Sequence, residues 1–192
     1  MRRANDFYPT PAWATEELLR QIPQIGGVIL EPCVGDGAIA RVIDCGDRIV
    51  YGSDIDPQMN CSFCGDAARR DFWESVRDVM FEERLDWAIT NPPFNVAAQI
   101  VPLAYEFADR GIAMLLRLSY LEPTEDRGAW LNEHPPTSMI VLPRISFTGN
   151  GKTDSVTCAW MVWEKDKTGT ITVAGNPKFI KQHNIHGLFA SA

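Results

Sequence analysis

Short apolar runs recur along the first 165 residues, and most of them end in polar or turn-forming residues. Runs of this kind are typical of strands that are buried in a parallel sheet. Six clear runs lie at residues 28–31, 49–54, 87–90, 112–116, 139–142 and 158–163, and a weaker one lies at residues 60–64. The pattern therefore predicts a sheet of six strands, or of seven if the weak run is counted.

Segments with helical spacing of apolar positions separate several of these runs: residues 11–22, 38–43, 71–80 and 97–110. Thr10 is the expected N-cap of the first. The third places five apolar side chains on one face: Phe72, Trp73, Val76, Val79 and Met80. In the fourth, Pro102 implies a kink or a late start. Strands that alternate with helices predict an α/β fold, with a doubly wound, mostly parallel sheet and helices on both faces.

Length and composition indicate one globular domain. The chain has 192 residues, of which 45% are hydrophobic and 22% charged, as in ordinary globular domains. We expect a core at about residues 7–165 and a C-terminal extension at residues 166–192. No apolar stretch approaches the ~20 residues of a membrane span, and the start lacks the apolar run of a secretory signal. A cytoplasmic protein with reduced cysteines and no membrane contact is expected.

Charge is distributed unevenly along the chain. The net charge of −7 argues mildly against general binding of nucleic acid, because phosphate contacts are made by Lys and Arg. Residues 1–140 hold 12 basic and 22 acidic side chains, whereas residues 141–192 hold six basic and three acidic ones. If a polyanion binds, the last third of the chain is the expected region.

A glycine-containing loop follows the first predicted strand. It reads Glu-Pro-Cys-Val-Gly-Asp-Gly at residues 31–37, and Gly35 and Gly37 would let the backbone pass close to a ligand. Asp54 ends the second predicted strand, 23 positions after Glu31, near the spacing at which an acidic residue meets ribose hydroxyls in dinucleotide folds. The alternatives are an ordinary strand-to-helix turn and a solvated turn aspartate.

The segment Asn-Pro-Pro-Phe at residues 91–94 follows another predicted strand and is the most informative part of the chain. Its prolines lack N–H groups and restrict φ, which makes the turn rigid. The side-chain carbonyl of Asn91 and the backbone carbonyl of Pro92 could accept both hydrogens of an amino group, while Phe94 stacks on the attached ring. The alternative is a proline-rich turn at a strand end.

In these motifs and their order the chain resembles the amino-methyltransferases of the class I, Rossmann-like fold, especially DNA adenine-N6 methyltransferases. The resemblance covers about residues 7–165 and includes Asp-Phe-Tyr-Pro-Thr-Pro at residues 6–11, ahead of the glycine loop, as in the gamma arrangement. It implies a seven-stranded Rossmann-like methyltransferase sheet and S-adenosyl-L-methionine as the cofactor. The methyl group would pass to the N6 amino group of adenine in DNA, with no general base and no metal.

The resemblance also assigns roles to individual residues. Tyr8, Thr10 and Pro11 would hold the methionine part of the cofactor, above Glu31 and Gly35, and Asp54 would take the ribose. For the cofactor adenine, Asp71 in Asp-Phe-Trp is the first choice and Asp66 the alternative, while Phe72 can equally be a core residue. Two residues before the last strand complete the set. Phe147 would pack on the other face of the extruded base, and Lys152 would contact phosphate. The alternative for this segment is a glycine-rich hairpin with a solvated lysine.

Several alternatives stay open. The acceptor base must be flipped out of a duplex or supplied by a single strand, and relatives of this fold methylate RNA adenine or guanine, or a protein glutamine amide. A catalytically silent, cofactor-binding partner subunit is also possible. No separate target-recognition domain is visible, so sequence specificity would be low, or supplied by short loops or by a partner chain. Cys61 and Cys64 have zinc-like spacing but lack a second pair, and we expect no metal.

Overall fold

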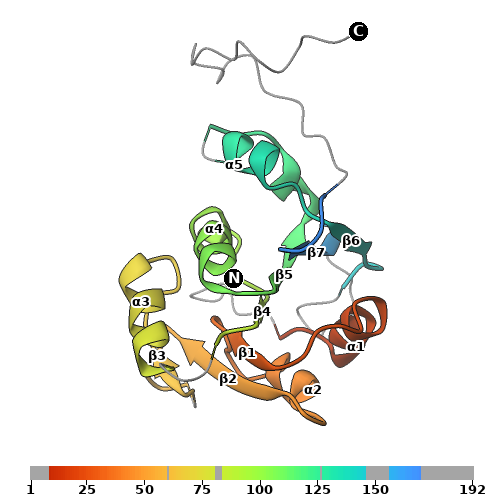
Figure 1. Cartoon of the computed structure of the whole chain (residues 1–192). Coiled ribbons are helices and arrows are strands. Elements are labelled where there is room, and N and C mark those ends of the chain that lie inside the picture. Colours follow the sequence, from red (N-terminus) through yellow and green to blue (C-terminus); the bar gives the residue numbers. More distant parts are fainter. Residues whose placement is uncertain (1–8, 60, 81–83, 126, 146–155, 170–192) are drawn as a thin grey trace, which may run out of the picture.

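A seven-stranded sheet forms the centre of the structure, a computed structural model that describes residues 9–59, 61–80, 84–125, 127–145 and 156–169 (Figure 1). The strands are β1 (Val28–Glu31), β2 (Ile49–Asp54), β3 (Phe63–Cys64), β4 (Trp87–Thr90), β5 (Gly111–Arg117), β6 (Ser138–Val141) and β7 (Cys158–Glu164). Their spatial order is β3-β2-β1-β4-β5-β7-β6. β7 runs antiparallel to both of its neighbours, and the other pairs are parallel.

The predicted strands are confirmed with small shifts at their ends. β1, β2 and β4 have the predicted bounds, and the weak run is the short edge strand β3. β6 ends one residue early, at Val141, although Leu142 is buried and its N–H still donates to the Cys158 carbonyl at 3.0 Å. The central strands are buried throughout, which explains why their apolar runs are continuous.

Helices cover both faces of the sheet, as predicted (Figure 1). α1 (Ala12–Gln21) and α2 (Ala40–Ile43) pack on one face, where Trp160 donates its indole N–H to the Ala14 carbonyl at 2.7 Å. α3 (Arg70–Val79), α4 (Ala97–Phe107), the 3-10 helix η2 (Leu118–Leu121) and α5 (Gly128–Glu133) contribute to the other face. None of the helices in the described ranges has the length and apolar content to span a bilayer. The five cysteines are free thiols.

Two predictions about the helices were wrong, and one of the two alternatives for a third helix is excluded. Pro11, not Thr10, is the N-cap of α1, and no side chain caps that end. Val79 is 72% exposed, because it lies at the edge of the apolar face in the last turn of α3 and no other element covers it. Pro102 lies inside α4, which begins at Ala97, so the late start is excluded.

The order of the strands reverses between β1 and β4. β1 is hydrogen-bonded to β2 on one side and to β4 on the other. The chain therefore leaves β1 and β4 toward opposite faces of the sheet, and the loops that follow these two strands diverge from each other. In open α/β sheets such a switch point creates a crevice at the carboxyl ends of the strands, where ligands bind. Glu31 and Asn91 both lie at this point.

Candidate functional site

A cavity of about 480 Å³ opens at the carboxyl ends of β1, β2, β3 and β4. This volume is within the range of about 300–1,000 Å³ that is usual for small-molecule sites. Its walls combine the residues before α1 with the loops after these four strands, so segments far apart in the sequence meet here. Six of the sequence-predicted site residues line it or lie at its rim: Thr10, Glu31, Gly35, Asp54, Asp66 and Asn91.

The loop after β1 is tied to the end of β2 through Asp54. Gly35 has a φ of +50°, in the left-handed region that favours glycine, and its N–H donates to Oδ2 of Asp54 at 2.9 Å. The N–H of Asp56 donates to Oδ1 at 2.9 Å. These two bonds orient the carboxylate, and each of its oxygens keeps a further lone pair for a ligand hydroxyl.

Glu31 is a buried carboxyl group at the floor of the cavity. Its side chain is held by the N–H of Ala40, which donates to Oε2 at 2.7 Å, and the residue is only 2% exposed. Burial raises the pKa of Glu31 well above its ordinary value, and the nearby charges of Asp36 and Asp54 act in the same direction. The Ala40 hydrogen bond opposes the shift without cancelling it.

The cavity has a strongly acidic lining. Five of its residues carry carboxyl groups: Glu31, Asp36, Asp54, Asp56 and Asp66. No Lys or Arg lies among the lining residues within the described ranges. The field in such a cavity attracts cations and repels phosphate groups. A Rossmann-like loop with these surroundings is therefore poorly suited to a pyrophosphate and well suited to a ligand with positive charge.

The Asn-Pro-Pro-Phe turn meets this cavity through Asn91 and Pro93, whereas Pro92 is not among the lining residues. The side-chain NH2 of Asn91 donates to the Thr10 hydroxyl at 3.2 Å, which joins the turn to the segment before α1. The carbonyl of Pro93 accepts the Val96 N–H at 3.1 Å. The carbonyl of buried Pro92 accepts no hydrogen bond from the described residues. The turn is thus fixed at both of its ends.

Phe94 does not line the cavity. Its half-buried ring packs against the core cluster on the α1 face, and the guanidinium carbon of Arg117 lies 4.3 Å from the ring centroid. Arg117 is the last residue of β5, directly beside β4 in the sheet. Sequence reasoning had no means of finding this contact, because it joins the turn after β4 to the end of β5, 23 positions away.

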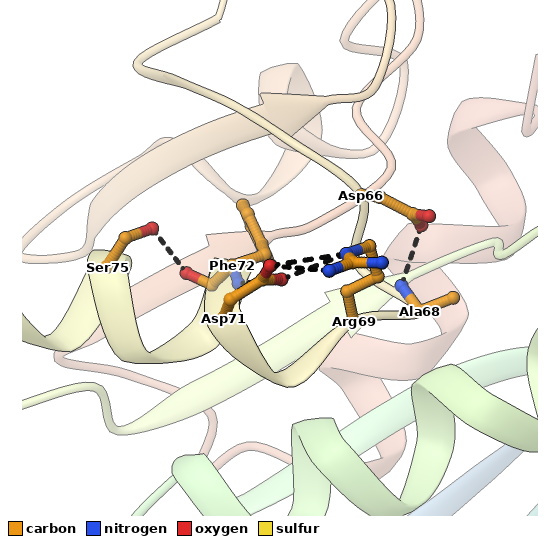
Figure 2. A network of polar contacts seen from close by, with 6 residues as sticks. All are labelled: Asp66, Ala68, Arg69, Asp71, Phe72 and Ser75. Carbon is orange, nitrogen blue, oxygen red and sulfur yellow. Dashed lines mark hydrogen bonds and ion pairs between the residues drawn. The ribbon is translucent and has the colours of Figure 1, made fainter.

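The two aspartates proposed for the cofactor adenine have different surroundings (Figure 2). Asp66 lines the cavity, and its Oδ1 accepts the Ala68 N–H at 2.9 Å. Asp71 lies on α3 outside the cavity lining and forms an ion pair with Arg69 at 2.8 Å, with its side chain 64% exposed. Arg69 also lowers the pKa of Asp71. The structure thus brings Asp66, and not Asp71, to the other site residues.

Phe72 lies behind the cavity wall. It is buried in the core and meets the Trp73 ring edge-on, with 5.4 Å between the centroids. A Cβ on Gly65, which lines the cavity, would lie 2.7 Å from a carbon of the Phe72 ring. Phe72 is therefore a core residue, and it could influence a bound ligand only through its contact with Gly65.

The remaining predicted residues lie elsewhere. Pro11 and Gly37 are not part of the cavity lining, although Gly37 has a left-handed φ of +76°. Tyr8, Phe147 and Lys152 lie outside the described residues. Sequence reasoning missed Asp36, Asp56 and Asn95, which follow strand ends and could have been found by that position alone. Cys61 and Cys64 belong to no cluster of three or more potential metal ligands in the described ranges.

Solved structures with low sequence identity share this fold. The modification subunit of a proposed type I restriction enzyme from Vibrio vulnificus YJ016 superposes with a TM-score of 0.60 at 15% identity, over 87% of this chain and 46% of that one. A proposed RNA methyltransferase from Pyrococcus horikoshii gives 0.58 at 17% identity, over 83% and 88%. A proposed hemolysin from Lactococcus lactis gives 0.59 at 14% identity, over 86% and 93%.

These superpositions show the fold of the chain but not the reaction, which must be argued from the residues of the site. The chain spans less than half of the restriction subunit, and the three structures carry three different names. No protein-family model matches the chain, and a search of curated proteins found no match. The sheet order, with β7 antiparallel beside β5, agrees with the superpositions. The chain has the class I, Rossmann-like fold of S-adenosylmethionine-dependent methyltransferases.

Proposed function

We propose that this protein transfers a methyl group from S-adenosyl-L-methionine to an exocyclic amino group, with the N6 amino group of adenine in DNA as the leading acceptor. One observation carries the proposal. Asn91, in a rigid proline turn, lies at the rim of an acidic cavity and is held there by Thr10. An amide in this position can bind an amino group beside a cationic cofactor.

The residues of the cavity fit the proposed cofactor. S-adenosylmethionine carries a sulfonium and an ammonium group, and the four aspartates of the lining complement this charge, whereas buried Glu31 favours its neutral form. Asp54 would accept the ribose hydroxyls, and Asp66 would accept the adenine amino group. A nicotinamide or flavin dinucleotide carries a pyrophosphate instead, which this lining would repel.

The turn supplies the acceptor chemistry. The Asn91 side-chain carbonyl and the Pro92 backbone carbonyl would accept the two hydrogens of the amino group, which orients its lone pair toward the methyl donor. The same oxygens stabilise the positive charge that develops on the nitrogen during transfer. The cofactor supplies an activated methyl group, so the chain needs to position the amino group rather than to deprotonate it first.

The acceptor base must leave a base stack to reach this rim. Extrusion from a duplex costs a few kcal/mol, and a single strand avoids most of that cost. RNA adenine or guanine, a protein glutamine amide and a silent partner role are the alternatives. Incubation with labelled cofactor and separate DNA, RNA and protein pools, followed by nucleoside and peptide mass analysis, distinguishes them. Label in protein alone, or in no pool, would contradict the proposal.

Two substitutions separate acceptor binding from cofactor binding. Asn91→Ala should lower the methyl-transfer rate at least about 100-fold, since it removes a preorganised acceptor, while the cofactor affinity measured by calorimetry should stay nearly unchanged. Asp54→Ala should weaken the cofactor instead. Asn132→Ala, an exposed asparagine on α5, is the control. Full activity of the Asn91 variant would rule out this mechanism.

A further inference from the structure

Arg117 lies over the ring that would hold the acceptor. It ends β5, and its guanidinium carbon is 4.3 Å from the centroid of Phe94, in the turn that follows β4. At this distance the cation is attracted to the face of the aromatic ring. Arg117 forms no ion pair and no side-chain hydrogen bond with the described residues. Among the described residues, the ring of Phe94 is therefore the main contact of the Arg117 side chain.

Other arginines near aromatic rings have additional partners. Arg70 and Arg77 both lie over Phe107, at 5.7 and 5.3 Å from its centroid. Arg70 also forms an ion pair with Glu106 at 2.6 Å, and Arg77 lies 3.9 Å from the Asp78 carboxylate. Arg117 thus sits closer to its ring than these two, and no carboxylate of the described residues pairs with it.

The neighbours of Phe94 differ in how readily they can move. On one side, buried apolar side chains of the core cluster on the α1 face pack against Phe94. Arg117 is a half-exposed residue with a flexible side chain, and its guanidinium can be hydrated when it leaves the ring. Of these neighbours, only Arg117 can give way to a planar ligand at small cost.

We propose that the Arg117 guanidinium occupies the stacking surface of the acceptor base in the free protein and leaves it when the base binds. This inference rests on the proposed function, because it takes Phe94 as that surface. A cation–π contact at an exposed site is worth about a two- to fivefold change in an equilibrium constant. Stacking of a base on an aromatic side chain is worth about 5- to 150-fold, so the base wins the competition.

The competition predicts a gain of base binding when the cation is removed. The probe is a single-stranded oligonucleotide with one 2-aminopurine, whose fluorescence falls on stacking, compared with the same strand carrying an abasic site. The ratio of the two dissociation constants isolates the base from phosphate contacts. Arg117→Met, and Arg117→Gln as a second neutral variant, should raise this preference for the base about two- to fivefold. Arg117→Lys should stay near the wild type.

Two controls locate the effect. Arg77→Met removes the same kind of contact from Phe107, away from the cavity, and should leave the ratio unchanged. In a Phe94→Leu background, Arg117→Met should have no effect, since the surface for which cation and base compete is gone. A ratio that is unchanged or lower in both neutral Arg117 variants overturns the inference, as does an equal gain in the Phe94→Leu background.

Methyl transfer is measured separately on the same proteins. The coupling between Arg117 and Phe94 is the gain in base preference that Arg117→Met gives only when Phe94 is present. Methyl transfer without this coupling would overturn the inference and leave the proposed function intact. Coupling without transfer to any acceptor would support the exchange of cation and base on Phe94 and contradict the proposed function.

Discussion

Asp66 and Asp71 are five positions apart and differ in what their carboxylates can reach. Asp66 faces the cavity with one hydrogen bond from Ala68, whereas Asp71 is exposed and paired with Arg69 (Figure 2). Asp66→Asn should therefore weaken S-adenosylmethionine binding about 10- to 100-fold, as expected for a hydrogen bond to a charged group. Asp71→Asn should change it less than about threefold. Calorimetric titration of both variants decides between them, and a larger loss for the Asp71 variant would restore the first choice from sequence.

Glu31 gives the stability of the protein a pH dependence. Its raised pKa means that the folded protein keeps a proton which the unfolded chain releases near pH 4.3. The stabilising contribution is complete below that pH and falls as the pH rises toward the folded pKa. Glu31→Gln lacks this titration, so the variant should gain stability relative to the wild type as the pH rises from about 4.3 to 7.

Thermal melts of both proteins across this range measure the effect. The comparison uses the difference between the two melting temperatures at each pH, which cancels the titration of the other carboxylates. Parallel curves would show that burial of Glu31 does not shift its ionisation.

At the scale of single elements, the strands were more predictable than the contacts between loops. β1 and β4 are almost entirely buried, β2 is mostly half-buried, and continuous apolar runs with polar ends have few other interpretations. The parallel sheet then brings Glu31, Asp54 and Asn91 to one edge, because the carboxyl ends of parallel strands meet there. This much of the candidate site follows from strand assignment alone.

The remainder depends on long-range partners. Thr10 was expected to cap α1, yet its hydroxyl accepts the Asn91 amide from 81 positions away. The choice between Asp66 and Asp71 depends on where α3 begins relative to the cavity wall, which no local pattern encodes. Arg117 and Phe94 meet only because β5 lies beside β4.

Gly52 in β2 supports the glycine loop by its small size. A Cβ at this position would lie 2.9 Å from Cγ2 of Val34, a buried and β-branched side chain in the loop after β1. Val34 is also held by its N–H, which donates to the Ser53 carbonyl at 2.7 Å. Gly52→Ala should therefore lower the free energy of unfolding by about 1–3 kcal/mol through overpacking, and should weaken cofactor binding by displacing the loop.

Gly26→Ala is the matched control, since nothing lies within 4 Å of its added Cβ. It should change the free energy of unfolding by less than about 1 kcal/mol and leave the cofactor affinity unchanged. Urea denaturation and calorimetric titration provide the two readouts. If the Gly52 variant lost stability but bound cofactor normally, Val34 would not transmit strain to the site.

On the scale of the whole molecule, the charge distribution predicts separate regions for the proposed cofactor and for a nucleic-acid acceptor. The acidic cavity repels phosphate, and the net charge is −7, so a nucleic-acid backbone needs a basic region elsewhere. Residues 170–192 contain Lys178 and Lys181 and no acidic residue. Their placement is outside the described residues, and their charge makes them, beside Lys152, candidates for phosphate contacts with the proposed acceptor.

Replacing both lysines by glutamine tests this assignment through salt dependence. If both neutralise phosphates, Lys178→Gln with Lys181→Gln should weaken oligonucleotide binding at low salt and reduce the slope of log affinity against log salt by about 1.4. Cofactor affinity should not change if the two lysines contact only the nucleic-acid backbone. Arg84→Gln, which removes a charge already paired with Asp109 at 2.6 Å, should leave the slope unaltered. An unchanged slope in the double variant would place the phosphate contacts elsewhere, since net charge alone cannot alter the number of counterions released.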